Sequence, residues 1–291
     1  MRINKNLIAI LIGMLLLYIL YDHYFWAFHH QKNKNLAHLN LNNYVVDIDK
    51  KEIVGVDQDL SGLTYNKKSG TLFAVINRPS KIIELTTSGD LIREIDVEDI
   101  YDVEGITHIS DNKYFITEES SQTIFEVIID NDTKIVNRAN TNSLGIGFGN
   151  LKSNKGFEGI EWNPVDGSLY VVKEKKPLKV IKISGMATIE TSYNLDIREW
   201  FPNHKHFHVK DLSSVFVHAG NQNIFLTSDK TKIVCEYDQN GDLLSYMWLK
   251  KGLHKLSEDI PQAEGLAIDD DDNVYLVSEP NLFYRFKKMQ N

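Results

Sequence analysis

Hydrophobic residues recur along this chain in short runs separated by turn-forming residues, and the pattern repeats five times. Each repeat opens with a small residue inside an apolar strand, and an aromatic residue follows nine to eleven residues later. The small residues lie between 43 and 55 residues apart and are Gly62, Gly105, Gly159, Ser214 and Gly265. The aromatic residues are Phe73, Tyr114, Tyr170, Phe225 and Tyr275. Strand-rich sequence with a period of roughly 40–50 residues is typical of a β-propeller.

The first repeat predicts four strands, over residues 63–65, 71–76, 81–85 and 91–97. The turn before its last strand aligns with the Asn240-Gly241 turn of the fourth repeat. An Asn-Gly pair supplies the positive φ that a tight hairpin needs. Each repeat is therefore predicted to be a blade of four antiparallel strands.

The last repeat lacks its outer strand, because the chain ends at Asn291 soon after the strand predicted over residues 282–287. Residues 44–49 form a spare strand ahead of the first repeat. Pairing these two segments would close the ring and leave no exposed sheet edge. The predicted fold is thus all-β, a five-bladed β-propeller of four-stranded antiparallel blades over residues 44–291, closed by an N-terminal strand.

An apolar segment precedes the repeats. Arg2 and Lys5 come before an apolar run over residues 7–21, and an aromatic stretch extends this run to Phe28. The whole segment reaches the length of about 20 residues that spans a bilayer. We expect residues 1–30 to form an uncleaved signal anchor, a single transmembrane helix, and residues 31–43 to form a polar tether. Because a positive N-terminus stays in the cytoplasm, the propeller is expected on the periplasmic side of the cell (inner) membrane.

Charge and cysteine content narrow the possible functions. The formal net charge of −8 argues against a general nucleic-acid-binding protein, since such a protein must neutralise phosphates. Cys235 is the only cysteine, so an intrachain disulfide is excluded. Its apolar neighbours predict a packed strand residue.

Acidic residues occupy equivalent places in several repeats. In a meander blade, the start of the first strand and the end of the second strand lie on the same face of the propeller. Carboxylates of both kinds should therefore converge at one mouth of the central channel. Those at the starts of first strands are Glu104, Glu158 and Glu264; those at the ends of second strands are Glu118, Glu174, Asp229 and Glu279, with Asn77 in the first repeat. Just before the first strands stand Asp59, Asp102 and Asp211.

This ring predicts a cation site. Many carboxylates in a partly desolvated funnel repel one another, and a bound hard cation would relieve the repulsion. Ca²⁺ takes six to eight oxygen ligands in flexible geometry, which suits such a ring. The seven acidic residues are the predicted ligands, and Ca²⁺ is the predicted ion. Because Ser61 and Ser213 replace glutamate in two repeats, we expect the ion to bind to one side of the channel axis.

Two other motifs could bind a metal, but we expect both to be ordinary surface segments. His204, His206 and His208 alternate, so an extended segment would project all three imidazoles to one face, where they could bind Zn²⁺ or Cu²⁺. A solvated loop is the default for them. Residues 269–272 are four aspartates that lack the glycine and the final glutamate of an EF-hand loop, so they predict an exposed turn.

Several motifs together resemble the SdiA-regulated, YjiK-like family, which is related to NHL-repeat proteins. They are the Leu-Ser-Gly-Leu-Thr-Tyr opening at residues 60–65, the repeated Glu-Gly-Ile/Leu strands, Phe-Ile-Thr-Glu-Glu at 115–119 and Leu-Val-Ser-Glu-Pro at 276–280. The resemblance covers residues 44–288. It implies a five-bladed propeller with a calcium site in its channel region, and it implies no established activity.

Two functional classes remain open beside a scaffold without a metal, which would need the acidic ring to point into solvent. The first is a membrane-anchored, calcium-binding module that presents its acidic mouth to an unknown small ligand or protein. The alternative is a metal-dependent hydrolase similar to gluconolactonases or phytase-like esterases, with Glu104, Glu158 or Glu264 as the general base. A basic cluster that would hold phosphate is missing from the strand ends, where Arg78, Lys173 and Lys175 are the cations. The sequence leaves the question of catalysis undecided.

Overall fold

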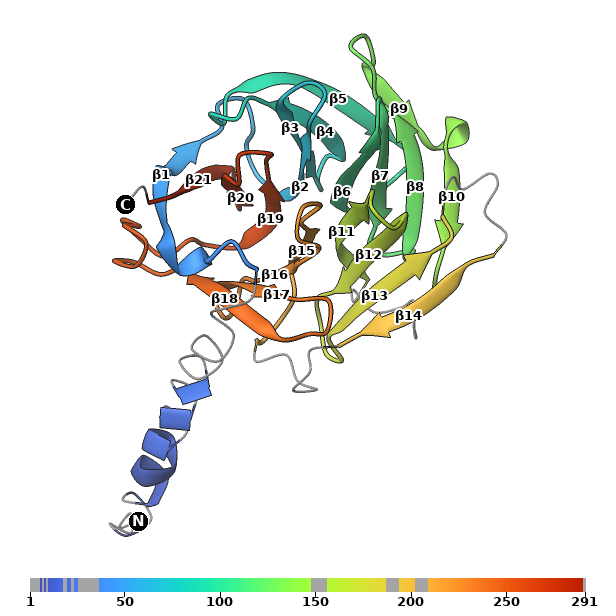
Figure 1. Ribbon diagram of the computed structural model, residues 1–291. Coiled ribbons are helices and arrows are strands. Elements are labelled where there is room, and N and C mark those ends of the chain that lie inside the picture. Colours follow the sequence, from blue (N-terminus) through green and yellow to red (C-terminus); the bar gives the residue numbers. More distant parts are fainter. Residues whose placement is uncertain are drawn as a thin grey trace, which may run out of the picture.

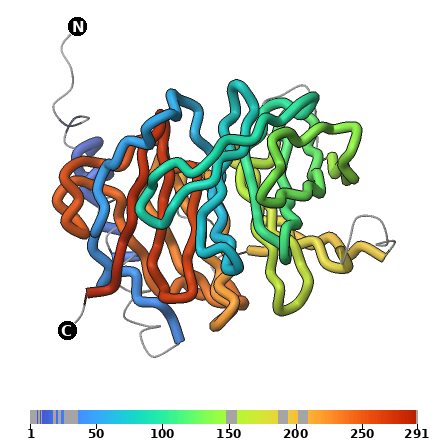
Figure 2. Tube along the Cα trace, turned by 90° about the horizontal axis from the view of Figure 1, so that it is seen from above, coloured from blue at the N-terminus to red at the C-terminus, as the bar shows by residue number. Residues whose placement is uncertain are grey.

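The computed structural model of the chain describes residues 37–147, 156–186, 194–201 and 209–289, with separate residues between 6 and 25 (Figure 1). Its sheets form five blades around a central axis, as the repeats predict. Seen after a 90° turn, the strands run across the thickness of this disc (Figure 2).

The first two blades come from the strands between residues 60 and 145. Blade 1 contains β2 (Leu60–Asn66), β3 (Thr71–Ile76), β4 (Lys81–Leu85) and β5 (Leu91–Glu98). Blade 2 contains β6 (Val103–Ser110), β7 (Lys113–Glu118), β8 (Thr123–Ile128) and β10 (Asn142–Gly145). All of these neighbours pair in antiparallel fashion.

The remaining blades follow the same plan. Blade 3 contains β11 (Phe157–Asn163), β12 (Ser168–Lys173), β13 (Lys179–Ser184) and β14 (Asp196–Trp200). Blade 4 contains β15 (Ser214–Val217), β16 (Ile224–Ser228), β17 (Ile233–Tyr237) and β18 (Leu243–Trp248). Blade 5 contains β19 (Ala263–Ile268), β20 (Val274–Ser278) and β21 (Leu282–Lys288), and its fourth strand is β1 (Tyr44–Glu52).

The ring closes as predicted, because the N-terminal strand completes the last blade. β1 pairs antiparallel with β21, from Tyr44 opposite Lys288 to Glu52 opposite Leu282. The short 3₁₀ helix η1 (Leu41–Asn43) leads into β1. Both strands thereby lose the open edge that each would otherwise present.

Blade 1 has a fifth strand that the repeat pattern does not predict. After β8 the chain leaves blade 2, and β9 (Ile135–Asn137) pairs in parallel with β5, as the adjacent strands in Figure 1 show. The 3₁₀ helix η2 (Arg138–Asn140) then returns the chain to β10. This excursion covers the outer edge of blade 1, which protects the edge from pairing with another chain.

The five repeated aromatic residues are buried in the hydrophobic core. Each has at most 2% of its surface exposed, at Phe73, Tyr114, Tyr170, Phe225 and Tyr275. Hydrophobic clusters join neighbouring blades; one of them unites Phe73 and Ile95 of blade 1 with Ile106 and Phe125 of blade 2. Burial of such large rings is the main source of stability in a fold whose blades cannot stand alone.

The N-terminal region differs in part from the prediction. Among the described residues, no helix is both long and apolar enough to cross a membrane, so the transmembrane helix is not confirmed. Residues 10–17 are helical, and much of the remaining predicted anchor lies outside the described residues. The end of the predicted tether packs on the propeller instead of extending from it, since Leu39 and Leu41 are buried against blades 4 and 5.

Candidate metal centre at the channel mouth

The innermost strands of four blades carry a β-bulge at the repeated small residue. In β6 the register with β7 passes from Val103 to Gly105, which leaves Glu104 without a partner in the ladder. β19 skips Glu264 in the same way between Ala263 and Gly265. A bulge of this kind re-aims a side chain and is common beside functional sites. The bulges therefore turn these glutamates away from their own sheets.

Glycine follows the glutamate because the inner strands crowd around the axis. A Cβ atom on Gly105 would lie 2.8 Å from Oγ1 of Thr117 and 3.0 Å from the carbonyl oxygen of Glu158 in the next blade. A Cβ atom on Gly62 would lie 2.7 Å from the carbonyl oxygen of Glu104. The Glu-Gly motif thus combines a ligand side chain with the close approach of two blades.

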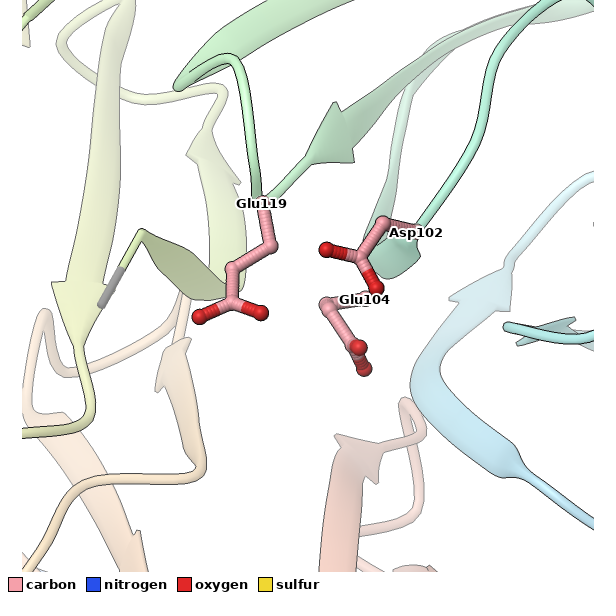
Figure 3. Close-up of side chains that lie close together, drawn as sticks. All are labelled: Asp102, Glu104 and Glu119. Carbon is pink, nitrogen blue, oxygen red and sulfur yellow. The ribbon is translucent and has the colours of Figure 1, made fainter. Parts of the chain in front are cut away.

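Three carboxylates of blade 2 meet at the mouth, from the start of β6 and the end of β7. One oxygen from each of Asp102, Glu104 and Glu119 lies within 4.8 Å of the others, and the three side chains point toward one another (Figure 3). The Glu119 N–H donates a 2.9 Å hydrogen bond to the Asp102 carbonyl oxygen, which fixes the ends of β6 and β7 together. This arrangement is the only group of three potential metal ligands within the described residues.

Blade 1 supports the central member of this cluster from the other side. The Ser61 hydroxyl donates to Oε2 of Glu104 at 2.8 Å, and the Asn77 amide donates to Oε1. Oδ1 of Asn77 is buried and has no hydrogen-bond partner. A buried acceptor without a donor is costly. An oxygen-preferring cation beside Glu104 would satisfy this atom, so the residues present fit a Ca²⁺ ion.

Electrostatics couple the cluster to the glutamates of the other blades. Burial raises the pKa of Glu104 to about 8, and the charges of Glu119, Asp102 and Glu279 contribute. Burial likewise raises the pKa of Glu158 well above its usual range, and the negative charges of Glu104 and Glu119 raise it further. These carboxyls hold protons at neutral pH unless a cation replaces them.

The pKa values of the glutamates of blade 5, on the other side of the mouth, are also raised. Burial raises the pKa of Glu264 to about 8, with Asp229 and Glu104 as the leading charges. Burial also raises the pKa of Glu279, and the charges of Asp59 and Asp229 add to it. Six of the seven predicted ligands therefore share one electrostatic environment: Glu104, Glu158, Glu174, Asp229, Glu264 and Glu279.

Two members of this group are partly neutralised by lysine. Lys230 binds Glu174 at 2.7 Å and Lys175 binds it at 3.1 Å. Burial alone would raise the pKa of Glu174, but the hydrogen bonds from these two lysines lower it. Lys232 binds Asp229 at 2.6 Å. A cation is consequently needed most on the side of Glu104 and Glu158.

Glu118 is the predicted ligand that lies outside this group. Its carboxylate accepts a 2.8 Å hydrogen bond from the Tyr101 N–H and another from the Ser121 hydroxyl, and it pairs with Arg138 at 3.3 Å. Arg138 belongs to η2, in the excursion that the repeats do not predict. Glu118 therefore helps to hold the excursion against blade 2.

Glu119 takes the equivalent place in the mouth, and the strand register shows why. Phe73 of β3 lies opposite Thr64, two residues after Gly62, whereas in blade 2 it is Phe115 that lies opposite Thr107. Phe115, not Tyr114, is thus the equivalent aromatic residue, and the residue four positions later is Glu119. Two adjacent aromatic residues, Tyr114 and Phe115, are both compatible with the repeat, and the register selects the second.

The remaining candidate motifs are the alternating histidines, the aspartate turn and Cys235. His204, His206 and His208 lie outside the described residues. The turn at residues 269–272 is held by its own hydrogen bonds, among them a 2.7 Å bond from the Tyr275 hydroxyl to Asp269. Cys235 is buried, and burial raises the pKa of its thiol, so it is a packing residue as predicted.

The family model named SdiA-regulated matches residues 36–287, which include every strand of the propeller except the last residue of β21. The chain belongs to the SdiA-regulated family. Among solved structures, a luciferin-regenerating enzyme is similar over 83% of this chain and 95% of its own, with 14% identity and a TM-score of 0.53. The nidogen/laminin complex matches 76% of this chain and 73% of its own, at 14% identity and a TM-score of 0.49.

Virginiamycin B lyase from Staphylococcus aureus matches 78% of this chain and 66% of its own, at 16% identity and a TM-score of 0.42. At these identities the likeness concerns the fold alone. The family confirms the resemblance seen in the sequence, and function has to be argued from the channel mouth.

Proposed function

We propose that this member of the SdiA-regulated family is a membrane-anchored propeller that binds Ca²⁺ at its acidic mouth outside the cytoplasm. The mouth then presents the ion, or the surface that the ion organises, to a small ligand or a protein partner. The cluster of Asp102, Glu104 and Glu119, with oxygens within 4.8 Å, is the observation that carries the proposal. The apolar segment over residues 7–28 supports the anchor and the single-pass location in the inner membrane.

The chemistry of the donor set favours Ca²⁺ over softer metals. The cluster offers carboxylate oxygens, and Oδ1 of Asn77 adds a neutral oxygen beside Glu104. Imidazole and thiolate ligands, which transition metals prefer, do not occur in the cluster. Ligands from both blade 1 and blade 2 would let one ion hold the two blades together at the mouth.

A thermal-denaturation experiment tests the proposal on the full chain in detergent. Ca²⁺ at about one hundred times its Kd should stabilise the folded state by about 2.7 kcal/mol relative to chelated protein. The double variant Glu104→Gln/Glu119→Gln should lose this response. Asp270→Asn, which removes an exposed carboxylate in the β19–β20 turn, is the matched control and should keep it. If the wild type has the same melting temperature with and without Ca²⁺, the proposal is wrong.

Metal-dependent hydrolysis is a second candidate, and Glu264 is the residue that favours it. This carboxyl lies outside the three-residue cluster but shares its electrostatic environment, and its pKa of about 8 suits proton transfer near neutral pH. A bound cation would supply Lewis-acid polarisation of a carbonyl or phosphoryl oxygen. Glu264 would accept the proton of an attacking water.

Turnover of ester, lactone and phosphomonoester substrates separates the two candidates. In the hydrolase, Glu264→Gln should abolish turnover while the Ca²⁺-dependent rise in Tm persists. In the binding module, the wild type should turn over none of these substrates, although Ca²⁺ still stabilises it.

A further inference from the structure

The outer strand of blade 3 has an open edge. β14 pairs with β13 along its whole length, and within the described residues no strand pairs with its other side (Figure 1). Blades 1 and 5 differ in this respect. In blade 1 the strand β9 pairs with the outer edge, and in blade 5 the Val46 N–H of β1 donates a 2.8 Å hydrogen bond to the His254 carbonyl oxygen. An open row of backbone donors and acceptors is a template for pairing with another strand.

β14 gains little from the packing of its own blade. Four of its residues in succession, from Asp196 to Glu199, are exposed, and no other described strand has such a run. Ile197 has 42% of its surface exposed, and Phe201, directly after the strand, has 49%. A strand that buries so little side-chain surface recovers little of the entropy that is lost when it is ordered. A second strand on the open edge would add backbone hydrogen bonds and apolar contacts.

The C-terminal end of β14 is fixed to its neighbours. The Trp200 indole donates a 3.2 Å hydrogen bond to the Gln239 carbonyl oxygen of blade 4, and it meets the Tyr237 ring edge-on with centroids 5.8 Å apart. Lys179 of β13 binds Glu199 at 2.7 Å. An edge that is already held in one position loses less freedom when a partner binds to it.

The charges along β14 fit a second copy of the same strand. In an antiparallel pair with two-fold symmetry, one residue lies opposite itself. Centring the pair on Arg198 or on Glu199 would place like charges directly opposite each other, which is destabilising. Centring it on Ile197 places Asp196 opposite Arg198 of the second copy, twice, and brings two exposed isoleucines together. The side chains of Asp196 and Arg198 are 52% and 77% exposed, so both can turn to a partner.

We propose that blade 3 is the surface through which two copies of this chain associate, by antiparallel pairing of their β14 strands about Ile197. Each strand contributes only five residues, so the interface is small and the dimer is expected to be weak and reversible. The inference goes beyond the proposed function and does not depend on Ca²⁺, because β14 shares no residue with the channel mouth.

Oxidative cross-linking of the full chain in detergent tests the pairing, with copper phenanthroline as the oxidant. Opposed residues of an antiparallel pair have Cα atoms about 4.5–5.5 Å apart, within the range of a disulfide bond. Ile197→Cys should therefore form a covalent dimer on a non-reducing gel. Arg198→Cys is the matched control, because its two copies would lie about 8 Å apart in this register, beyond the reach of a disulfide. The native Cys235 is buried, so the wild type should not cross-link.

Charge reversal in the Ile197→Cys background tests the complementarity. Arg198→Asp alone and Asp196→Arg alone should each lower the yield of covalent dimer roughly threefold or more, since each places like charges opposite each other. The double swap Asp196→Arg/Arg198→Asp should restore the yield. This recovery would distinguish pairing of β14 from proximity caused by the N-terminal segment, which is the same in all variants.

Three results would overturn the proposal. The first is an Ile197→Cys yield no higher than that of Asp270→Cys, whose exposed position in the β19–β20 turn reports random collision. The second is an Arg198→Cys yield as high as that of Ile197→Cys, because the register would then be wrong. The third is a double swap that cross-links as poorly as the single reversals.

Discussion

The Ser61 hydroxyl of blade 1 donates a 2.8 Å hydrogen bond to the Glu104 carboxylate of blade 2, across the boundary between the two blades. The same hydroxyl lies 3.1 Å from the Glu104 carbonyl oxygen. Ser61 thus fixes both the backbone and the side chain of the central residue of the cluster. Serine replaces glutamate in this blade, and its function here is to orient the glutamate of its neighbour.

Ser61→Ala should therefore weaken Ca²⁺ binding. The variant removes a hydrogen bond to a carboxylate, a loss of about 1.5 kcal/mol or roughly tenfold in Kd. Isothermal titration with Ca²⁺ measures the change. Ser213→Ala is the matched control, because Ser213 occupies the equivalent place in blade 4 but donates to the Ala263 carbonyl oxygen at 2.6 Å. Equal loss of affinity in both variants would contradict a specific effect of Ser61 on Glu104.

The cation-free protein should lose stability as the pH rises. Glu104 and Glu264 have a folded-state pKa of about 8, against 4.5 for an unperturbed glutamate. The folded state therefore binds more protons than the unfolded state between these values, and the free energy of unfolding falls from about pH 4.5 to about pH 8. Denaturant unfolding of Ca²⁺-depleted protein at pH 5 and pH 8 measures this slope.

Ca²⁺ should flatten or reverse the same slope, because it binds the ionised carboxylates and its affinity rises with pH. Glu104→Gln/Glu264→Gln should reduce the slope without Ca²⁺, since the amides do not titrate, while Glu158 keeps part of it because its pKa is also raised. A cation-free wild type that is more stable at pH 8 than at pH 5 would mean that these carboxyls are ionised in the folded state.

The fold could be predicted from the sequence because every blade repeats the same physical constraints. A small residue is required where inner strands approach, and a large aromatic residue is required between blades, as at Gly62 and Phe73. Strand polarity alone then brings Glu104, Glu158 and Glu264 to one face. Because blade 5 lacks a fourth strand in the sequence, its completion by β1 could also be predicted.

The exceptions lie where blade 2 departs from the repeat. β9 is only three residues long and pairs with a neighbouring blade, so no periodic signal marks it. Arg138 belongs to that excursion and forms an ion pair with Glu118. Successive residues point to opposite sides of an extended chain, so Glu119 faces the mouth. Without the register of β6 and β7, the two adjacent glutamates were indistinguishable.

Gly105→Ala should destabilise the propeller by about 1–3 kcal/mol, the usual effect of an added methyl group in a packed region. The new Cβ atom would meet Oγ1 of Thr117 at 2.8 Å and the Glu158 carbonyl oxygen at 3.0 Å, and this backbone oxygen can retreat only if its strand moves. Urea denaturation measures the change. Gly147→Ala is the control, because nothing lies within 4 Å of its added Cβ. A Gly105→Ala protein as stable as wild type would show that the inner strands can separate freely.

Glu236 should be the residue that holds the N-terminal segment on the propeller. It is fully buried, and its carboxylate accepts 2.8 Å hydrogen bonds from the Leu39 N–H and the Asn223 amide and a 2.6 Å bond from the Ser245 hydroxyl. Ser245 in turn accepts a 3.0 Å bond from the Leu41 N–H. A buried carboxylate whose partners are all donors cannot be replaced by an amide without leaving a donor facing a donor.

Glu236→Gln is therefore expected to cost about 1–3 kcal/mol of unfolding free energy and to release residues 37–43 before the blades unfold. Limited proteolysis followed by mass spectrometry detects such release as early cleavage in this segment. Glu258→Gln is the matched control, because Glu258 is exposed and pairs only with Lys50 among the described residues. If Glu236→Gln and Glu258→Gln are cleaved at the same rate as wild type, apolar packing of Leu39 and Leu41 is enough to hold the segment, and the buried carboxylate has another role.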